Sequence, residues 1–146
     1  LACNDMHYGH MSNLILPDKS LNMGYGWETR RRRQPGHDWV ILRLGHPGRL
    51  SRVVVDTQWF KGNYPASCAL YGALLTEMDE EEITAEIGEW QEILPRSELG
   101  PNREHEFDRL RTVGTVSHVR FDIHPDGGVA RLKLYGHRDP QYTARP

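Results

Sequence analysis

The 146-residue chain lacks most of the features that mark a specialised class of protein. Its two cysteines, Cys3 and Cys68, are too few for a disulfide framework and too far apart for a CxxC site. No apolar run is long enough to cross a membrane, so we expect no membrane partner. The net charge of −2 gives no bulk attraction to nucleic acid or anionic lipid. The 38% of hydrophobic residues suffices for a folded core, and the length fits one domain.

Lysine is scarce as well, because only 3 of the 18 basic residues are Lys and 15 are Arg. Arginine is the side chain that holds carboxylates and planar polar groups through two parallel hydrogen bonds. Four arginines are consecutive, Arg30–Arg33, and they lie between two tryptophans. Nucleic-acid binding by this run is the weaker alternative at a near-neutral net charge, so we expect no nucleic-acid partner. Extended as a strand, the run would divide, with Arg30 and Arg32 on the face of Glu28 and the other two on the opposite face.

The hydrophobic pattern is typical of short β-strands bounded by Gly, Pro, Asn or Asp. The candidate strands are residues 40–44, 52–56, 68–75, 89–94, 105–110, 116–124 and 129–135. This spacing, without long helices between the strands, predicts an all-β fold of the jelly-roll β-sandwich type. The one helical candidate, residues 77–87, carries 6 acidic residues and is interpreted as a solvated surface helix or loop.

The last two candidate strands alternate apolar and polar residues on either side of Pro125-Asp-Gly-Gly128. With Asp126-Gly127 as a two-residue turn, residues 119, 121 and 123 would face residues 134, 132 and 130. We therefore expect a β-hairpin with its apolar side toward the core. Its other side would pair Asp122 with Arg131 and set Arg120 opposite Lys133.

Polar residues that could carry chemistry follow the arginine run and the second candidate strand. His37-Asp38 could act as an acid–base pair or as a metal ligand with its carboxylate partner, or could simply form a turn. Lys61 and Asn63 follow a buried strand, where a sandwich places either ligand-binding groups or turn formers. No histidine pair has the spacing of a tight zinc site. We thus predict no metal-binding residues and no cofactor, while a divalent metal ion held by distant residues stays open.

Several uncommon motifs, in a fixed order, resemble the allantoicase family. They are Gly26-Trp-Glu-Thr-Arg-Arg-Arg-Arg33, Gly36-His-Asp-Trp39, Val55-Asp-Thr57 with Phe60-Lys-Gly-Asn63, and Pro125-Asp-Gly-Gly-Val-Ala-Arg131, together with Asn4-Asp-Met-His-Tyr-Gly9 and Ser117-His-Val-Arg120. The resemblance implies a galactose-binding-like jelly roll and the hydrolysis of allantoate to ureidoglycolate and urea in purine degradation. It also implies that residues 1–146 are a single allantoicase-type domain, similar to the second of two repeats, in a protein that forms homo-oligomers.

Allantoate itself suggests roles for the residues in these motifs, because it carries a carboxylate and two ureido arms on one carbon. Arginine suits the carboxylate and an amide suits a ureido arm, while expelling urea needs an acid and the incoming water needs a base. The residues expected to bind the substrate are Arg30, Arg32, Lys61, Asn63 and Arg131. The residues expected to move protons are His37, Glu28 and Asp38.

The alternative from another class is a non-catalytic galactose-binding-like module that binds a small ligand or a partner protein. No charged and apolar leader follows Leu1, and the few cysteines fit a reducing compartment. We therefore expect a cytoplasmic location, with the peroxisome as the alternative. Because the sequence does not begin with Met, we also expect a piece of a longer protein.

Overall fold

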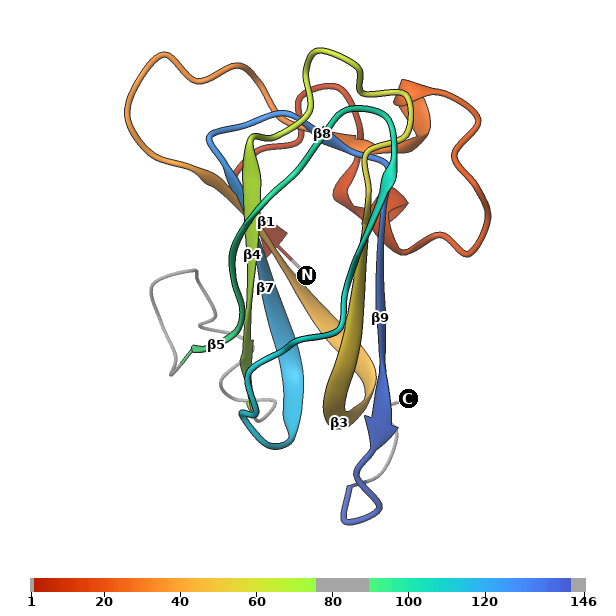
Figure 1. Cartoon of the computed structure of the whole chain (residues 1–146), viewed down its shortest axis with the longest axis vertical. Coiled ribbons are helices and arrows are strands. Elements are labelled where there is room, and N and C mark those ends of the chain that lie inside the picture. The colour runs from red at the N-terminus through yellow and green to blue at the C-terminus, as the bar shows by residue number, and fades with distance from the viewer. Residues whose placement is uncertain (1, 76–89, 143–146) are drawn as a thin grey trace.

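The computed structural model describes residues 2–75 and 90–142, which form a β-sandwich (Figure 1). Its strands are β1 (Ala2–Cys3), β2 (Trp27–Glu28), β3 (Asp38–Asp56), β4 (Ser67–Ala73), β5 (Gln91–Glu98), β6 (Glu104–Phe107), β7 (Val116–His124), β8 (Gly128–Val129) and β9 (Arg131–Arg138). Two short 3-10 helices, η1 (Met11–Ile15) and η2 (Met23–Tyr25), lie in the segment before β2. Within the described residues no helix is long and apolar enough to span a membrane. The helical candidate, residues 77–87, lies outside the described residues.

The long strand β3 joins the two layers of the sandwich. Its first part pairs antiparallel with β7 from Asp38 to Arg43, and its second part pairs with β9 from Gly48 to Asp56. Figure 1 shows β3 turning back between these two parts. The first layer has the order β1-β3-β7-β4-β5, while β6 and β9 both pair with the second part of β3. This arrangement confirms the expected all-β jelly-roll sandwich.

The core lies between the two layers because alternate residues of each strand point inward. Val40 and Phe121 reach it from the first layer, and Val53 and Leu132 reach it from the second. Trp27 of β2 is fully buried in the same cluster. Each large side chain buried in this way stabilises the fold by roughly 1.5–3 kcal/mol.

Most candidate strands are found close to their expected positions. The candidate at residues 116–124 coincides with β7, and residues 68–75, 89–94 and 105–110 correspond to β4, β5 and β6. Residues 40–44 and 52–56 are not separate strands, however, because both belong to β3. The Gly45-His-Pro-Gly48 segment, which the sequence pattern would treat as a break, lies inside that strand where its pairing shifts register.

The expected hairpin between residues 116–124 and 129–135 is wrong. β7 pairs with β3 and β4, whereas β9 pairs with the other part of β3, so the two strands belong to opposite layers. Their alternate apolar residues do face one another, but across the core and not along one sheet. The expected pairs of Asp122 with Arg131 and of Arg120 with Lys133 are therefore absent, and Arg120 instead binds Asp122 of its own strand through Nε, at 2.9 Å from Oδ1.

The connection between β7 and β9 crosses one end of the sandwich and fixes the loops there. β8 pairs with β2, and the amide of Gly128 donates to the carbonyl of Asn63 at 2.8 Å. Gly127 has a φ of 127°, and a Cβ on Gly128 would lie 1.9 Å from Cε1 of the buried Phe60. Glycine is required at both positions, one for its backbone conformation and the other for close packing. The loops that hold the candidate site meet at this end, the upper end in Figure 1.

Candidate functional site

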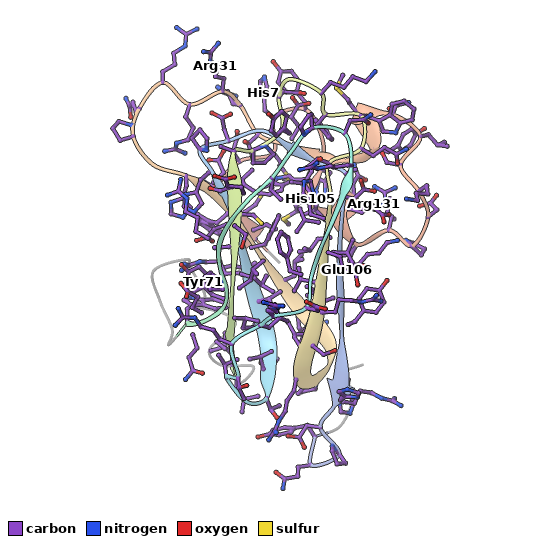
Figure 2. The ribbon with its side chains drawn as sticks, in the orientation of Figure 1. His7, Arg31, Tyr71, His105, Glu106 and Arg131 are labelled. Carbon is purple, nitrogen blue, oxygen red and sulfur yellow. The ribbon has the colours of Figure 1, made fainter. Side chains whose placement is uncertain are left out.

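An arginine-lined cleft of about 780 Å³ lies at this end of the sandwich. The whole run Arg30–Arg33 lines it, together with Asn4, Tyr8 and Asp38. Figure 2 shows Arg31 on the loop at this end, and His7 lies at the same end. Four arginines lining one concave surface make it suited to a small anion or a planar polar group.

The arginine run is a loop and not the strand that its sequence pattern suggested. β2 ends at Glu28, and side-chain carboxylates take the amides that a neighbouring strand would otherwise bind. The amide of Arg30 donates to Oδ2 of Asp5 at 2.6 Å, and the amide of Arg32 donates to Oδ2 of Asp126 at 2.8 Å. The expected division of the run between two faces is therefore wrong, and all four arginines line the same cleft.

Asp38 is held at the cleft by two side chains. Arg32 Nη1 donates to Asp38 Oδ1 at 2.7 Å, and Asn4 Nδ2 donates to the same oxygen at 2.9 Å. Asn4 also accepts from the amide of Trp39 at 2.9 Å, so it ties the first segment of the chain to the start of β3. The side chain of Asp38 is 2% exposed, which leaves it little freedom to change its orientation.

Two buried polar atoms of this pair have no hydrogen-bond partner among the described residues, Oδ2 of Asp38 and Nε of Arg32. Buried polar atoms in proteins are nearly always paired, because leaving one unpaired costs about 1–3 kcal/mol. A carboxylate oxygen accepts and a guanidinium N–H donates, so the two residues together have the groups to bind a ligand that carries both a donor and an acceptor. This is the combination that an amide or urea group offers.

The side chain of His37 lies apart from the cleft lining. Its Nε2 is 3.2 Å from Oδ2 of Asp122, and its ring lies 4.5 Å from the ring of His124. Burial raises the pKa of Asp122, although hydrogen bonds from Arg120 oppose the shift. Burial, with the nearby His37 and Arg96, lowers the pKa of His124 to about 4, so this imidazole is neutral at physiological pH.

A second polar group at this end joins β2 to the loop after β3. Asn63 Nδ2 donates to Oε2 of the half-buried Glu28 at 2.5 Å. Lys61, two residues earlier, is exposed and makes no hydrogen bond or ion pair within residues 2–75 and 90–142. Glu28 and Asn63 thus contact each other, although neither lines the cleft.

Arg131 lies inside the protein, where it binds the backbone of the segment between η1 and β2 (Figure 2). It is 2% exposed, and its guanidinium donates to the carbonyls of Asp18 at 2.9 Å, Tyr25 at 2.5 Å and Ala130 at 2.7 Å. These contacts support the neighbouring loops from within. Substrate binding by Arg131 stays a prediction.

The structure therefore brings some of the eight expected residues together and keeps others apart. Arg30, Arg32 and Asp38 share the cleft. Asn4 is the site residue that reasoning from chemical type missed, since an amide 34 positions before Asp38 has no local signal that links the two. Only its place in the Asn4-Asp-Met-His-Tyr-Gly9 motif pointed toward it.

Comparison with known proteins gives a consistent picture. The family model described as an allantoicase repeat matches residues 1–139. A probable allantoicase of Pseudomonas paraeruginosa is 54% identical over 137 residues, which are 93% of this chain and 41% of that protein. A probable allantoicase of Stutzerimonas stutzeri is 52% identical over the same share of each chain. The chain thus spans about two fifths of the length of the curated relatives it matches.

Solved structures agree with this similarity. The crystal structure of allantoicase from Saccharomyces cerevisiae superposes with a TM-score of 0.80 at 36% identity, over 94% of this chain and 39% of that chain. A CBM32 module from a family 31 glycoside hydrolase of Clostridium perfringens superposes with a TM-score of 0.67 at 11% identity, over 94% of this chain and 89% of that module. At so low an identity the second likeness concerns the fold alone.

Proposed function

This chain belongs to the allantoicase family, and from that premise we propose that it takes part in the hydrolysis of allantoate to ureidoglycolate and urea. The observation that carries the proposal is the arginine-lined cleft with the unpaired carboxylate oxygen of Asp38 beside Arg32. A substrate with one carboxylate and two ureido arms has the groups that such a surface can bind.

In this proposal the arginines bind the substrate carboxylate. Arg30 is exposed at the cleft, with Nη2 3.0 Å from Nδ1 of His7, and its other N–H groups remain for a ligand. Arg32 keeps Nη1 on Asp38, and we propose that its buried, unpaired Nε reaches the ligand when the complete site forms. Lys61 and the Glu28–Asn63 pair lie in neighbouring loops, and we propose that they bind a ureido arm when the complete site forms.

The proton transfers of the reaction need one group that accepts and one that donates. Water adds its oxygen to the central carbon while the C–N bond to the departing ureido group breaks, and the water proton must finally reach that nitrogen. We propose Asp38 as the base, because it is the buried carboxylate at the cleft. His37 and Glu28 are the proposed acids.

We also propose how this chain fits into the complete active protein. Because the chain spans about two fifths of the length of its curated relatives, we propose that it is one of two repeats in a longer polypeptide that assembles into homo-oligomers. Both described cysteines are free, which supports a reducing compartment, and we propose the cytoplasm.

A urea-release assay tests the proposed activity. Allantoate is supplied to this chain alone and to the same chain joined to the other repeat, and urea is measured over time. We expect urea release from the joined protein. If neither protein releases urea while both are folded, and allantoate does not bind to either, the proposed function is wrong.

A further inference from the structure

A cluster of three side chains on the outer face of the first layer has the composition of a metal site. Asp122 and His124 are two residues apart on β7, so they point to the same side of the sheet. His37 precedes β3, where Asp38 pairs with Ile123, and this register sets His37 beside both of them. One donor atom from each of the three residues lies within 4.8 Å of the other two.

We propose that His37, Asp122 and His124 bind a divalent transition-metal ion of the zinc type. Such an ion binds imidazole nitrogens and carboxylate oxygens at about 2.0–2.2 Å, which sets neighbouring donors about 3–3.5 Å apart. His37 Nε2 and Asp122 Oδ2 are already 3.2 Å apart. The two imidazole rings lie with their centroids 4.5 Å apart, so small rotations of the half-buried histidines bring the third donor into place.

The donor set selects the class of metal. Two imidazoles and one carboxylate favour zinc, cobalt, nickel or iron over magnesium and calcium, which prefer oxygen ligands. Arg120 supports the carboxylate by donating from Nε to Oδ1 at 2.9 Å and from Nη2 to Oδ2 at 3.1 Å. Its positive charge opposes any cation here, so an ion at this site would be held mainly by its bonds to the two imidazole nitrogens.

The cluster keeps an open side toward solvent. The side chain of His37 is 38% exposed, while that of Asp122 is 3% exposed. Three protein ligands with an accessible fourth position are the pattern of zinc sites that bind water or a further ligand. An ion here would also tie the loop of Arg30–Arg33 to strand β7. His37 directly follows this loop, and the next residue, Asp38, lines the cleft. The metal proposal rests on the geometry of this cluster, although it shares His37 with the proposed proton transfers.

Metal binding can be measured without any activity assay. The protein is treated with EDTA, dialysed, and titrated with Zn²⁺ by calorimetry and with Co²⁺ by visible absorption. We expect one ion per chain and the intense Co²⁺ bands of a four- or five-coordinate site. His37→Gln and His124→Gln should each weaken Zn²⁺ binding by at least about 10- to 100-fold, because losing a group that only hydrogen-bonds to a metal ligand already costs that much.

The matched control is His137→Gln, because His137 is an exposed histidine of β9 outside the cluster. It should bind Zn²⁺ as the unsubstituted protein does. Asp122→Asn could disturb folding through Arg120, so the half-exposed His37 provides the decisive variant, with circular dichroism as the check on folding. Absence of Zn²⁺ binding, or equal binding by His37→Gln and the control, would overturn the proposal. Because His37 is also a proposed acid, Zn²⁺ binding and not urea release is the readout for these variants, and the cleft is tested separately through Asp38.

Discussion

Replacing Arg131 by Met distinguishes a structural role from a role in substrate binding. The guanidinium donates to three backbone carbonyls, those of Asp18, Tyr25 and Ala130, at 2.5–2.9 Å. Methionine fills a similar volume but cannot donate, so these three hydrogen bonds are lost, together with the weaker contact of Nη2 with the exposed Asp18 carboxylate at 3.4 Å. The segment between η1 and β2 would then lose its attachment to β9.

The size of the effect follows from these contacts. Hydrogen bonds from a charged donor contribute about 1.5–3 kcal/mol each, but two of these carbonyls are only partly buried, so about 1 kcal/mol each is a fair value. The total loss is then about 3 kcal/mol in the free energy of unfolding. For a chain of this size, each kcal/mol lowers the melting temperature by about 2–4 °C, which gives a decrease of about 6–12 °C.

Thermal and denaturant unfolding followed by circular dichroism measure this loss. Arg138→Met is the matched control, since Arg138 is an exposed arginine at the end of the same strand. The control should change the free energy of unfolding by no more than about 0.5 kcal/mol. If Arg131→Met is as stable as Arg138→Met while its allantoate affinity falls, the structural reasoning is refuted and Arg131 acts on the ligand.

The remaining predictions concern the close packing at Gly128 and the burial of Cys68. Gly128→Ala should destabilise the protein by about 1–3 kcal/mol or more, because its Cβ would lie 1.9 Å from Phe60. Gly62→Ala is the control and should be nearly neutral, because a Cβ there has open space. Equal unfolding midpoints of the two variants would show that Phe60 moves freely. Burial raises the pKa of Cys68 to about 12, whereas a thiol in the unfolded chain has a pKa of about 8.5–9. Above pH 9 the unfolded chain loses this proton while the folded protein keeps it, so the stability of the fold should fall as pH rises beyond 9. In the native protein at pH 8 a thiol reagent should therefore leave Cys68 unmodified until denaturant is added, and rapid labelling of Cys68 itself, beyond that of the partly exposed Cys3, would contradict its burial.

The strand positions could be predicted from the sequence because burial imposes a period of two on each strand. Their arrangement could not. Alternate apolar residues at 119–123 and 130–134 must point inward both in a hairpin and in two strands that face each other across a core. Hydrophobic alternation is the same in the two cases, so it does not distinguish them. What decides between them is the pairing of both strands with the two parts of β3, and β3 itself contains two segments that look separate in sequence.

The site was predictable where its residues are neighbours in sequence. Arg30, Arg32 and Asp38 lie within nine positions and share the cleft. Contacts from distant segments could not be found from chemical type, because Asn4 and Asp126 reach the same loop only after the sandwich has formed. The buried position of Arg131 was hidden for the same reason, since its partners are backbone carbonyls more than one hundred positions away in two of three cases.

Urea release from allantoate by the Asp38→Asn variant, in this chain joined to the other repeat, tests the central claim most directly. The substitution keeps the size of the side chain but removes the base, and loss of such a group lowers turnover by roughly 100- to 10,000-fold. Asp108→Asn, at an exposed position outside the cleft, is the matched control and should keep full activity. We predict a loss of kcat/KM of at least about 100-fold for Asp38→Asn alone. A folded Asp38→Asn protein that releases urea as fast as the control would contradict the assignment of the reaction to this cleft.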